Sequence, residues 1–297
     1  MLYLSKQLSS AASLLRGSGL ALFAIAAFSW PLDARAHPSP SHTLDEINAH
    51  LEDTPDDPAL LRDKADTLIT MNRLSEAEDI AGQLLRAAPS DPENLYLSAK
   101  LTLLGGNSSQ ALAQTEALTH TAPDFAQGWN LYADLLYQAS KRDEAIAAKQ
   151  KYLQISATQD AAEYVTCADW LRERGGPGDA QAAIVLLDQG ISRIGVLMGL
   201  EQAAIEIDLS LKQWDSALHR LNILTARFRP SADLNVQRAS ILVQAGRFQE
   251  AVSAYDAAIA ILEASPSANR NPEQLKPRIA ALQDKKQSAL SKVPQLP

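Results

Sequence analysis

Apolar residues recur along this chain at intervals of three and four residues, the pattern of amphipathic helices. Within this pattern an alanine returns at spacings of 34, 34, 38, 34 and 34 residues, at Ala77, Ala111, Ala145, Ala183, Ala217 and Ala251. Turn-forming residues stand five positions before most of these marker alanines, at Asn72, Gly106, Ser140, Gly178 and Gly246. Lys212 is the exception. A fixed period of this length predicts a row of helical hairpins that bury their apolar faces against one another.

The residue types at fixed places in each period predict how a hairpin packs and begins. A second alanine lies twelve residues before the marker in four units, at Ala65, Ala99, Ala133 and Ala239. Alanine at both places lets the two helices of a hairpin approach closely. Asp57-Pro58 and Asp91-Pro92 each predict a helix start, with a side-chain acceptor followed by proline. Two units depart from the pattern, because 158–195 contains a glycine-rich insertion and Ile205 stands where a small residue is expected.

These residues resemble the tetratricopeptide repeat family, in which a large residue, a small residue and an aromatic precede an alanine that opens the second helix. Residues that follow the pattern include Trp129, Ala133, Ala145, Tyr152, Gly246, Phe248, Ala251, Tyr255 and Ala258. The resemblance implies an all-α fold, a right-handed α-α superhelix of about six helical hairpins. We expect the repeat array over 58–262, with helical caps on both sides of it.

The flanking segments have their own predicted roles. Residues 37–57 are expected to hold a leader and a capping helix at 43–54, which looks like half of a repeat unit. Residues 263–297 are expected to form a polar linker, a last capping helix at about 273–291 and a tail. Caps with a polar outer face are what a helical array needs at its ends.

Residues 1–36 have the pattern of a secretory signal peptide. Lys6 and Arg16 precede a short apolar stretch, and Ala34-Arg35-Ala36 supplies a small-x-small cleavage sequence. The stretch is shorter than the roughly 20 residues that cross a bilayer comfortably. We therefore expect cleavage after Ala36 and a periplasmic or secreted protein without membrane insertion. Retention of the segment as an anchor, or a cytosolic protein, are the alternatives.

Composition narrows the functional classes. The chain has a net charge of −8, which argues against nucleic acid and anionic membranes as partners. Cys167 is the only cysteine, so an internal disulfide is excluded, and its helical surroundings predict a buried thiol. The sequence contains no zinc-protease, serine-hydrolase, phosphate-loop or Cys-x-x-Cys motif. We therefore expect no enzyme activity and no cofactor.

Histidines near the predicted cleavage site define an alternative function. Cleavage after Ala36 would make His37 the new N-terminus, where its amine and imidazole together can bind copper. His42 and His50 follow, although His50 lies beside apolar residues and could instead pack against them. The alternative to a binding scaffold is thus a metal-binding or metal-delivery protein.

The resemblance also implies where a partner binds, because the first helix of each hairpin lines the groove of this family. Carried over to matching positions, the partner-binding residues are Arg62, Asp66, Tyr96, Lys100, Asn130, Asp134 and Tyr137. Asp66 stands where family members that grip a terminal carboxylate need a basic or amide group, so capture of an acidic tail is not expected. We expect a non-catalytic scaffold or adaptor that binds a protein or peptide in the cell envelope. An ordinary solvated helix surface is the alternative for each of these residues.

Overall fold

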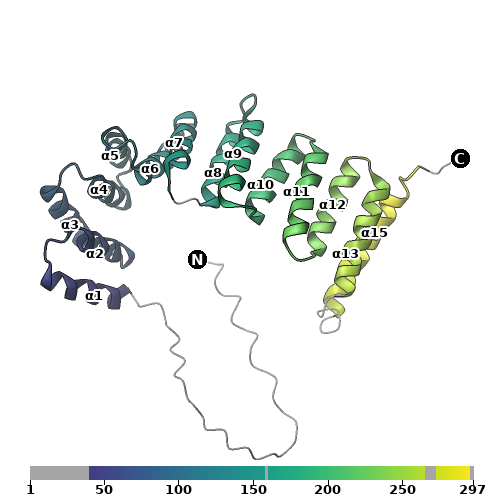
Figure 1. Cartoon of the computed structure of the whole chain (residues 1–297), viewed down its shortest axis with the longest axis horizontal. Helices are drawn as coiled ribbons and strands as arrows, with labels where there is room; N and C mark the ends of the chain where they lie inside the picture. The colour runs from purple at the N-terminus through teal and green to yellow at the C-terminus, as the bar shows by residue number, and fades with distance from the viewer. Residues whose placement is uncertain (1–39, 158–159, 265–271, 295–297) are drawn as a thin grey trace, which may run out of the picture. The chain divides into compact units, whose positions relative to one another are not determined.

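The computed structural model describes residues 40–157, 160–264 and 272–294, and every regular element in these residues is an α-helix (Figure 1). The helices are α1 (Pro40–Asp53), α2 (Pro58–Thr70), α3 (Leu74–Ala87), α4 (Pro92–Leu104), α5 (Ser108–Thr121), α6 (Ala126–Gln138), α7 (Arg142–Ile155), α8 (Ala161–Arg174), α9 (Asp179–Ile194), α10 (Met198–Ser210), α11 (Trp214–Arg227), α12 (Ala232–Gln244), α13 (Phe248–Glu263) and α15 (Pro272–Leu290). The all-α fold predicted from the sequence is confirmed. Residues 1–36 and His37 lie outside the described residues.

Helices α2 to α13 form six consecutive hairpins, each with a first helix of even number and a second helix of odd number. Each helix packs against the next helix in the chain, so the hairpins stack in sequence order (Figure 1). Helix α1 packs on α2, where Leu44 joins the core of the first hairpin. Helix α15 packs on α13, and Leu282 and Ala289 join the core of the last hairpins. No helix in the described residues is long and apolar enough to cross a membrane.

The turn inside every hairpin contains a residue in the left-handed backbone region. The φ angles are 58° at Asn72, 87° at Gly106, 62° at Ser140, 85° at Gly178, 57° at Lys212 and 75° at Gly246. These are the positions five residues before the marker alanines, and Lys212 adopts the same conformation as the others despite its side chain. After five of these six residues, the amide of the next residue donates a hydrogen bond to a carbonyl oxygen near the end of the preceding helix. One example is the bond from Gln213 N to Asp208 O, at 2.8 Å. Hairpin geometry therefore fixes the backbone at this position, whichever residue occupies it.

The marker alanines form the centre of the core, and all six are fully buried. Ile205 is fully buried too, so the fifth hairpin accommodates a branched side chain beside Ala204, which supplies the small residue one position earlier. In the fourth hairpin the close approach is made by Gly190, since a Cβ added there would lie 2.9 Å from the ring of Tyr164. The unit with the insertion therefore packs by a different pairing of small and large residues.

Helix starts follow the predicted chemistry. The Asp57 carboxylate accepts hydrogen bonds from the amides of Ala59 and Leu60, and Asp91 accepts from Glu93 and Asn94 in the same way. Such caps satisfy amides that have no partner within the helix. They hold α2 and α4 in the same relation to the preceding turn, which matters because these two helices carry the first part of the candidate site.

Candidate functional site

The first helices of the early hairpins form one surface, here called the first-helix surface and made by α2, α4, α6 and α8. Residues about one repeat apart meet across it. Lys100 Nζ on α4 lies 2.8 Å from Asp66 Oδ1 on α2, and Arg62 lies 2.7 Å from Glu93 Oε2. The predicted residues Arg62, Asp66 and Lys100 are therefore brought together, but their charges are already paired with one another or with Glu93.

A cavity of about 230 Å³ lies on this surface between α2, α4 and α6. Its lining residues are Arg62, Asp63, Asp66, Glu93, Tyr96, Leu97, Phe125 and Gln127. Tyr96 and Phe125 meet edge to face, with ring centroids 5.9 Å apart and an interplanar angle of 68°. Burial raises the pKa of the Tyr96 hydroxyl, so this group is a neutral hydrogen-bond donor at physiological pH. The cavity thus combines an aromatic wall with a paired arginine at its edge.

A second cluster on the same surface surrounds Lys149, a residue of the second helix α7. Its ammonium lies 2.5 Å from Asn130 Oδ1, 2.8 Å from Asp134 Oδ1 and 2.8 Å from Glu163 Oε2. The side chain of Lys149 is only 1% exposed, while those of Asp134 and Glu163 are 45% and 23% exposed. The predicted residues Asn130 and Asp134 are therefore held in place by a buried cation that our sequence reading did not select.

The repeat offers a signal for Lys149. The position four residues after the marker holds Ala81, Thr115, Lys149, Leu187, Leu221 and Tyr255 in the six units, and all are buried. Only one of these is charged. A lysine at a position that is otherwise buried and uncharged predicts a compensating acidic group nearby. The identity of that group depends on contacts between hairpins, which the sequence does not give.

Tyr137 belongs to an aromatic group beside this cluster. Its ring stacks on Trp170 of α8 with centroids 4.3 Å apart and an interplanar angle of 12°. The Arg142 guanidinium lies 3.8 Å from the centre of the Tyr137 ring, and the Tyr137 hydroxyl donates to Glu173. That hydrogen bond raises the pKa of the Tyr137 hydroxyl. Tyr137 is therefore fixed by its neighbours, and it forms part of a preorganised aromatic surface.

Cys167 lies near the Lys149 cluster and is fully buried, as predicted. Burial raises the pKa of its thiol to about 12; the nearby Lys149 charge lowers it in part and Glu163 raises it. The thiolate is the reactive form of cysteine, so a thiol held protonated in this way is a poor nucleophile. Cys167 acts as a small core residue at the junction of α7 and α8.

The histidine alternative gains no support from the described residues. His42 Nδ1 lies 3.5 Å from Glu46 Oε1 on α1, and His50 is exposed on the same helix. The two histidines are eight positions apart, which corresponds to about 12 Å along a helix axis, too far for both to bind one ion. No group of three candidate metal ligands occurs in the described part of the chain.

Comparison with known families identifies the repeat. A tetratricopeptide repeat family matches residues 96–161 and 206–269, which cover hairpins from both halves of the array. Together with the hairpin period and the turn geometry, this match identifies the matched segments as tetratricopeptide repeats. No curated protein matches the chain.

The solved structures that match the chain include the following three. A tetratricopeptide repeat protein from Parabacteroides merdae ATCC 43184 is 16% identical, with 84% of this chain and 92% of that chain covered and a TM-score of 0.43. MamA 41-end from Desulfovibrio magneticus RS-1 is 17% identical, with 52% and 85% covered and a TM-score of 0.40. The APC/C hetero-tetramer Cut9-Hcn1 is 13% identical, with 78% and 46% covered and a TM-score of 0.44. At these values the likeness carries no argument about this chain.

Proposed function

We propose that this protein is a non-catalytic scaffold that binds a protein or peptide segment on the first-helix surface. The observation that supports this most directly is the cavity between α2, α4 and α6, because it gathers Arg62, Asp66 and Tyr96 from two hairpins and adds Phe125 from a third. A volume of about 230 Å³ is smaller than the cavities that hold whole cofactors and suits one or two side chains. Tetratricopeptide repeat proteins use surfaces of this kind to contact the side chains of a bound protein or peptide.

The chemistry of the surface favours binding over catalysis. Its charged groups are engaged with one another, as in Lys100 with Asp66 and Lys149 with Asp134 and Glu163. Paired groups of this kind provide orientation and register to a bound peptide, and aromatic side chains provide contact area. We infer that a partner places an apolar side chain against Tyr96 and Phe125 and polar groups along α4 and α6.

The second part of the proposal is that the protein works in the periplasm or another compartment outside the cytoplasm. The support is the signal-like pattern of residues 1–36, with its cleavage sequence at Ala34-Arg35-Ala36. A test is to express the full chain with a C-terminal tag, separate the cell compartments and sequence the N-terminus of the mature form. Recovery from the periplasm with His37 as first residue supports export. A cytoplasmic protein that retains Met1 contradicts it.

The binding site is tested by placing a photo-reactive amino acid at Gln127, which lines the cavity, in the full chain within its native cells. The matched control places it at Val185, an exposed residue on the second helix α9. We expect one protein to cross-link from Gln127, not from Val185, and to be lost in the Tyr96→Ala/Lys100→Ala/Asn130→Ala variant. Cross-linking that is equal from both positions, or unchanged in the variant, contradicts the proposed surface.

A further inference from the structure

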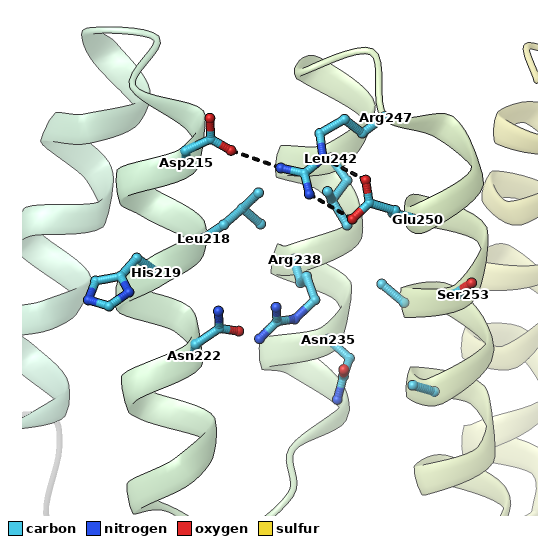
Figure 2. Close-up of a pocket in the computed structure, with 12 residues that line it drawn as sticks. Asp215, Leu218, His219, Asn222, Asn235, Arg238, Leu242, Arg247, Glu250 and Ser253 are labelled. Carbon is cyan, nitrogen blue, oxygen red and sulfur yellow. Dashed lines mark hydrogen bonds and ion pairs between the residues drawn. The ribbon is translucent and has the colours of Figure 1, made fainter.

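A larger pocket, of about 580 Å³, lies between α11, α12 and α13, in hairpins that do not contribute to the first-helix surface described above (Figure 2). Asn222 of α11 and Asn235 and Arg238 of α12 supply polar groups, and Leu218 and Leu242 supply apolar ones. Figure 2 shows the Arg238 guanidinium and the Asn222 side chain pointing toward the same part of the pocket. The lining thus pairs a cationic end with an apolar wall.

The repeat register explains why a pocket exists here. Asn235 and Arg238 lie 16 and 13 residues before the marker Ala251. The same positions in the third hairpin hold Trp129 and Tyr132, whose rings meet edge to face and pack against the core. In the last hairpin, an amide and a guanidinium therefore stand where two aromatic rings fill the equivalent space.

Arg238 is the unpaired charge of this pocket. It makes no hydrogen bond or ion pair to any described residue, and burial lowers the pKa of its guanidinium without an offsetting carboxylate. The acidic groups of the pocket are already engaged, because Arg247 lies 2.8 Å from Asp215 Oδ1 and 2.6 Å from Glu250 Oε2. A guanidinium has five N–H donors, and leaving them partly buried without acceptors is unfavourable. An acceptor anion would satisfy them.

We propose that this pocket binds a small organic anion whose carboxylate or phosphate group is received by Arg238 and by the side-chain amide of Asn222. Arginine suits both groups because its planar fork matches two oxygens at once. The volume lies in the range of small-molecule sites, and Leu218 and Leu242 can contact the carbon skeleton of the ligand. This site is additional to the peptide-binding surface and does not depend on it.

The test measures binding of three probes to the full chain by calorimetry at constant ionic strength: benzoate, phenyl phosphate and inorganic phosphate. We expect saturable binding of at least one organic anion, weakened about tenfold or more by Arg238→Gln. Arg229→Gln is the matched control, since Arg229 is exposed and outside the pocket, and it should bind like the wild type. Tighter binding of phenyl phosphate than of benzoate identifies a phosphate-type site, and tighter binding of benzoate identifies a carboxylate-type site.

A second variant keeps the test independent of any folding defect. Asn222→Asp places a carboxylate in the pocket without removing the arginine, and it should weaken binding of the organic anion by a comparable factor. Circular dichroism confirms that each variant is folded before titration. Absence of saturable binding by all three probes, or equal binding by the wild type and Arg238→Gln, overturns the proposal.

Discussion

Removing both carboxylates that hold Lys149, in the variant Asp134→Asn/Glu163→Gln, should destabilise the protein by about 3–5 kcal/mol. The Lys149 side chain is 1% exposed, so its ammonium depends on protein groups rather than on water. A hydrogen bond to a charged group contributes roughly 1.5–3 kcal/mol. Glu163, at 23% exposure, should account for more of the loss than Asp134, which is 45% exposed and shares its charge with solvent.

The decisive comparison adds Lys149→Met to that double variant. Methionine fills most of the lysine volume and leaves no buried charge, so the triple variant should be more stable than the double variant by about 2 kcal/mol. The physical reason is that the double variant retains a buried cation with only neutral partners, whereas the triple variant does not. Lys149→Met alone should lie between wild type and the double variant, because it leaves Asp134 and Glu163 unpaired but partly hydrated.

Urea unfolding of the full chain measures these differences, and amide hydrogen exchange over residues 126–174 assigns them to α6–α8. The local measurement is needed because repeat arrays do not always unfold in one step. The control is Lys100→Met, which removes an exposed partner of Asp66 and should cost no more than about 1 kcal/mol. The reasoning is refuted if the triple variant is no more stable than the double, or if the double costs no more than Lys100→Met.

Three further predictions concern the backbone turns, the helix crossing and the buried thiol. Lys212→Gly should raise the unfolding free energy by about 0.5–1 kcal/mol, because it relieves a left-handed lysine, and Gly246→Lys should lower it by about 1 kcal/mol; equal urea midpoints would contradict this. Gly190→Ala should destabilise by about 1–3 kcal/mol through the aromatic ring against it, whereas Gly82→Ala, with only a flexible side chain at 3.4 Å, should stabilise by up to about 1 kcal/mol; matching melting temperatures would refute the close approach. The pKa of the Cys167 thiol is raised from 9.0 to about 12. The stabilisation that the buried neutral thiol contributes is therefore fully present below pH 9, and it is lost above pH 9 because the thiol ionises first in the unfolded chain. Relative to Cys167→Ala, the unfolding free energy should therefore fall by up to about 1.4 kcal/mol per pH unit between pH 9 and 10.5, and a pH-independent difference would contradict the burial argument.

The repeat period made the fold predictable, since it fixed the hairpins, their turns and the buried alanines. Lys212 illustrates why the sequence predicted the positions of the turns better than the residue types that occupy them. Nothing in lysine favours a left-handed turn, yet the hairpin imposes one with φ of 57°. Backbone geometry is set by the period as a whole, so a single unfavourable residue does not change it.

The candidate site was predictable only in part, because it depends on contacts between hairpins. The family pattern selected Asn130 and Asp134 as surface groups, but their common partner is Lys149, which reaches them from the second helix α7. Arg238 was passed over for a similar reason. Its significance lies in what surrounds it, since an arginine on a helix is ordinary until the structure leaves it unpaired beside a pocket.

The packing of each helix against its neighbours in the chain has a consequence for communication within the molecule. A ligand bound near Tyr96 and one bound near Arg238 are separated by the fourth hairpin, α8 and α9, and any influence between them must cross each hairpin interface in turn. Because each hairpin contacts only the adjacent hairpins, such coupling weakens at every hairpin interface that is stably packed. The binding sites at the two ends of the array can therefore be occupied, mutated or lost almost independently. Each site is thus free to change its ligand specificity without altering the other.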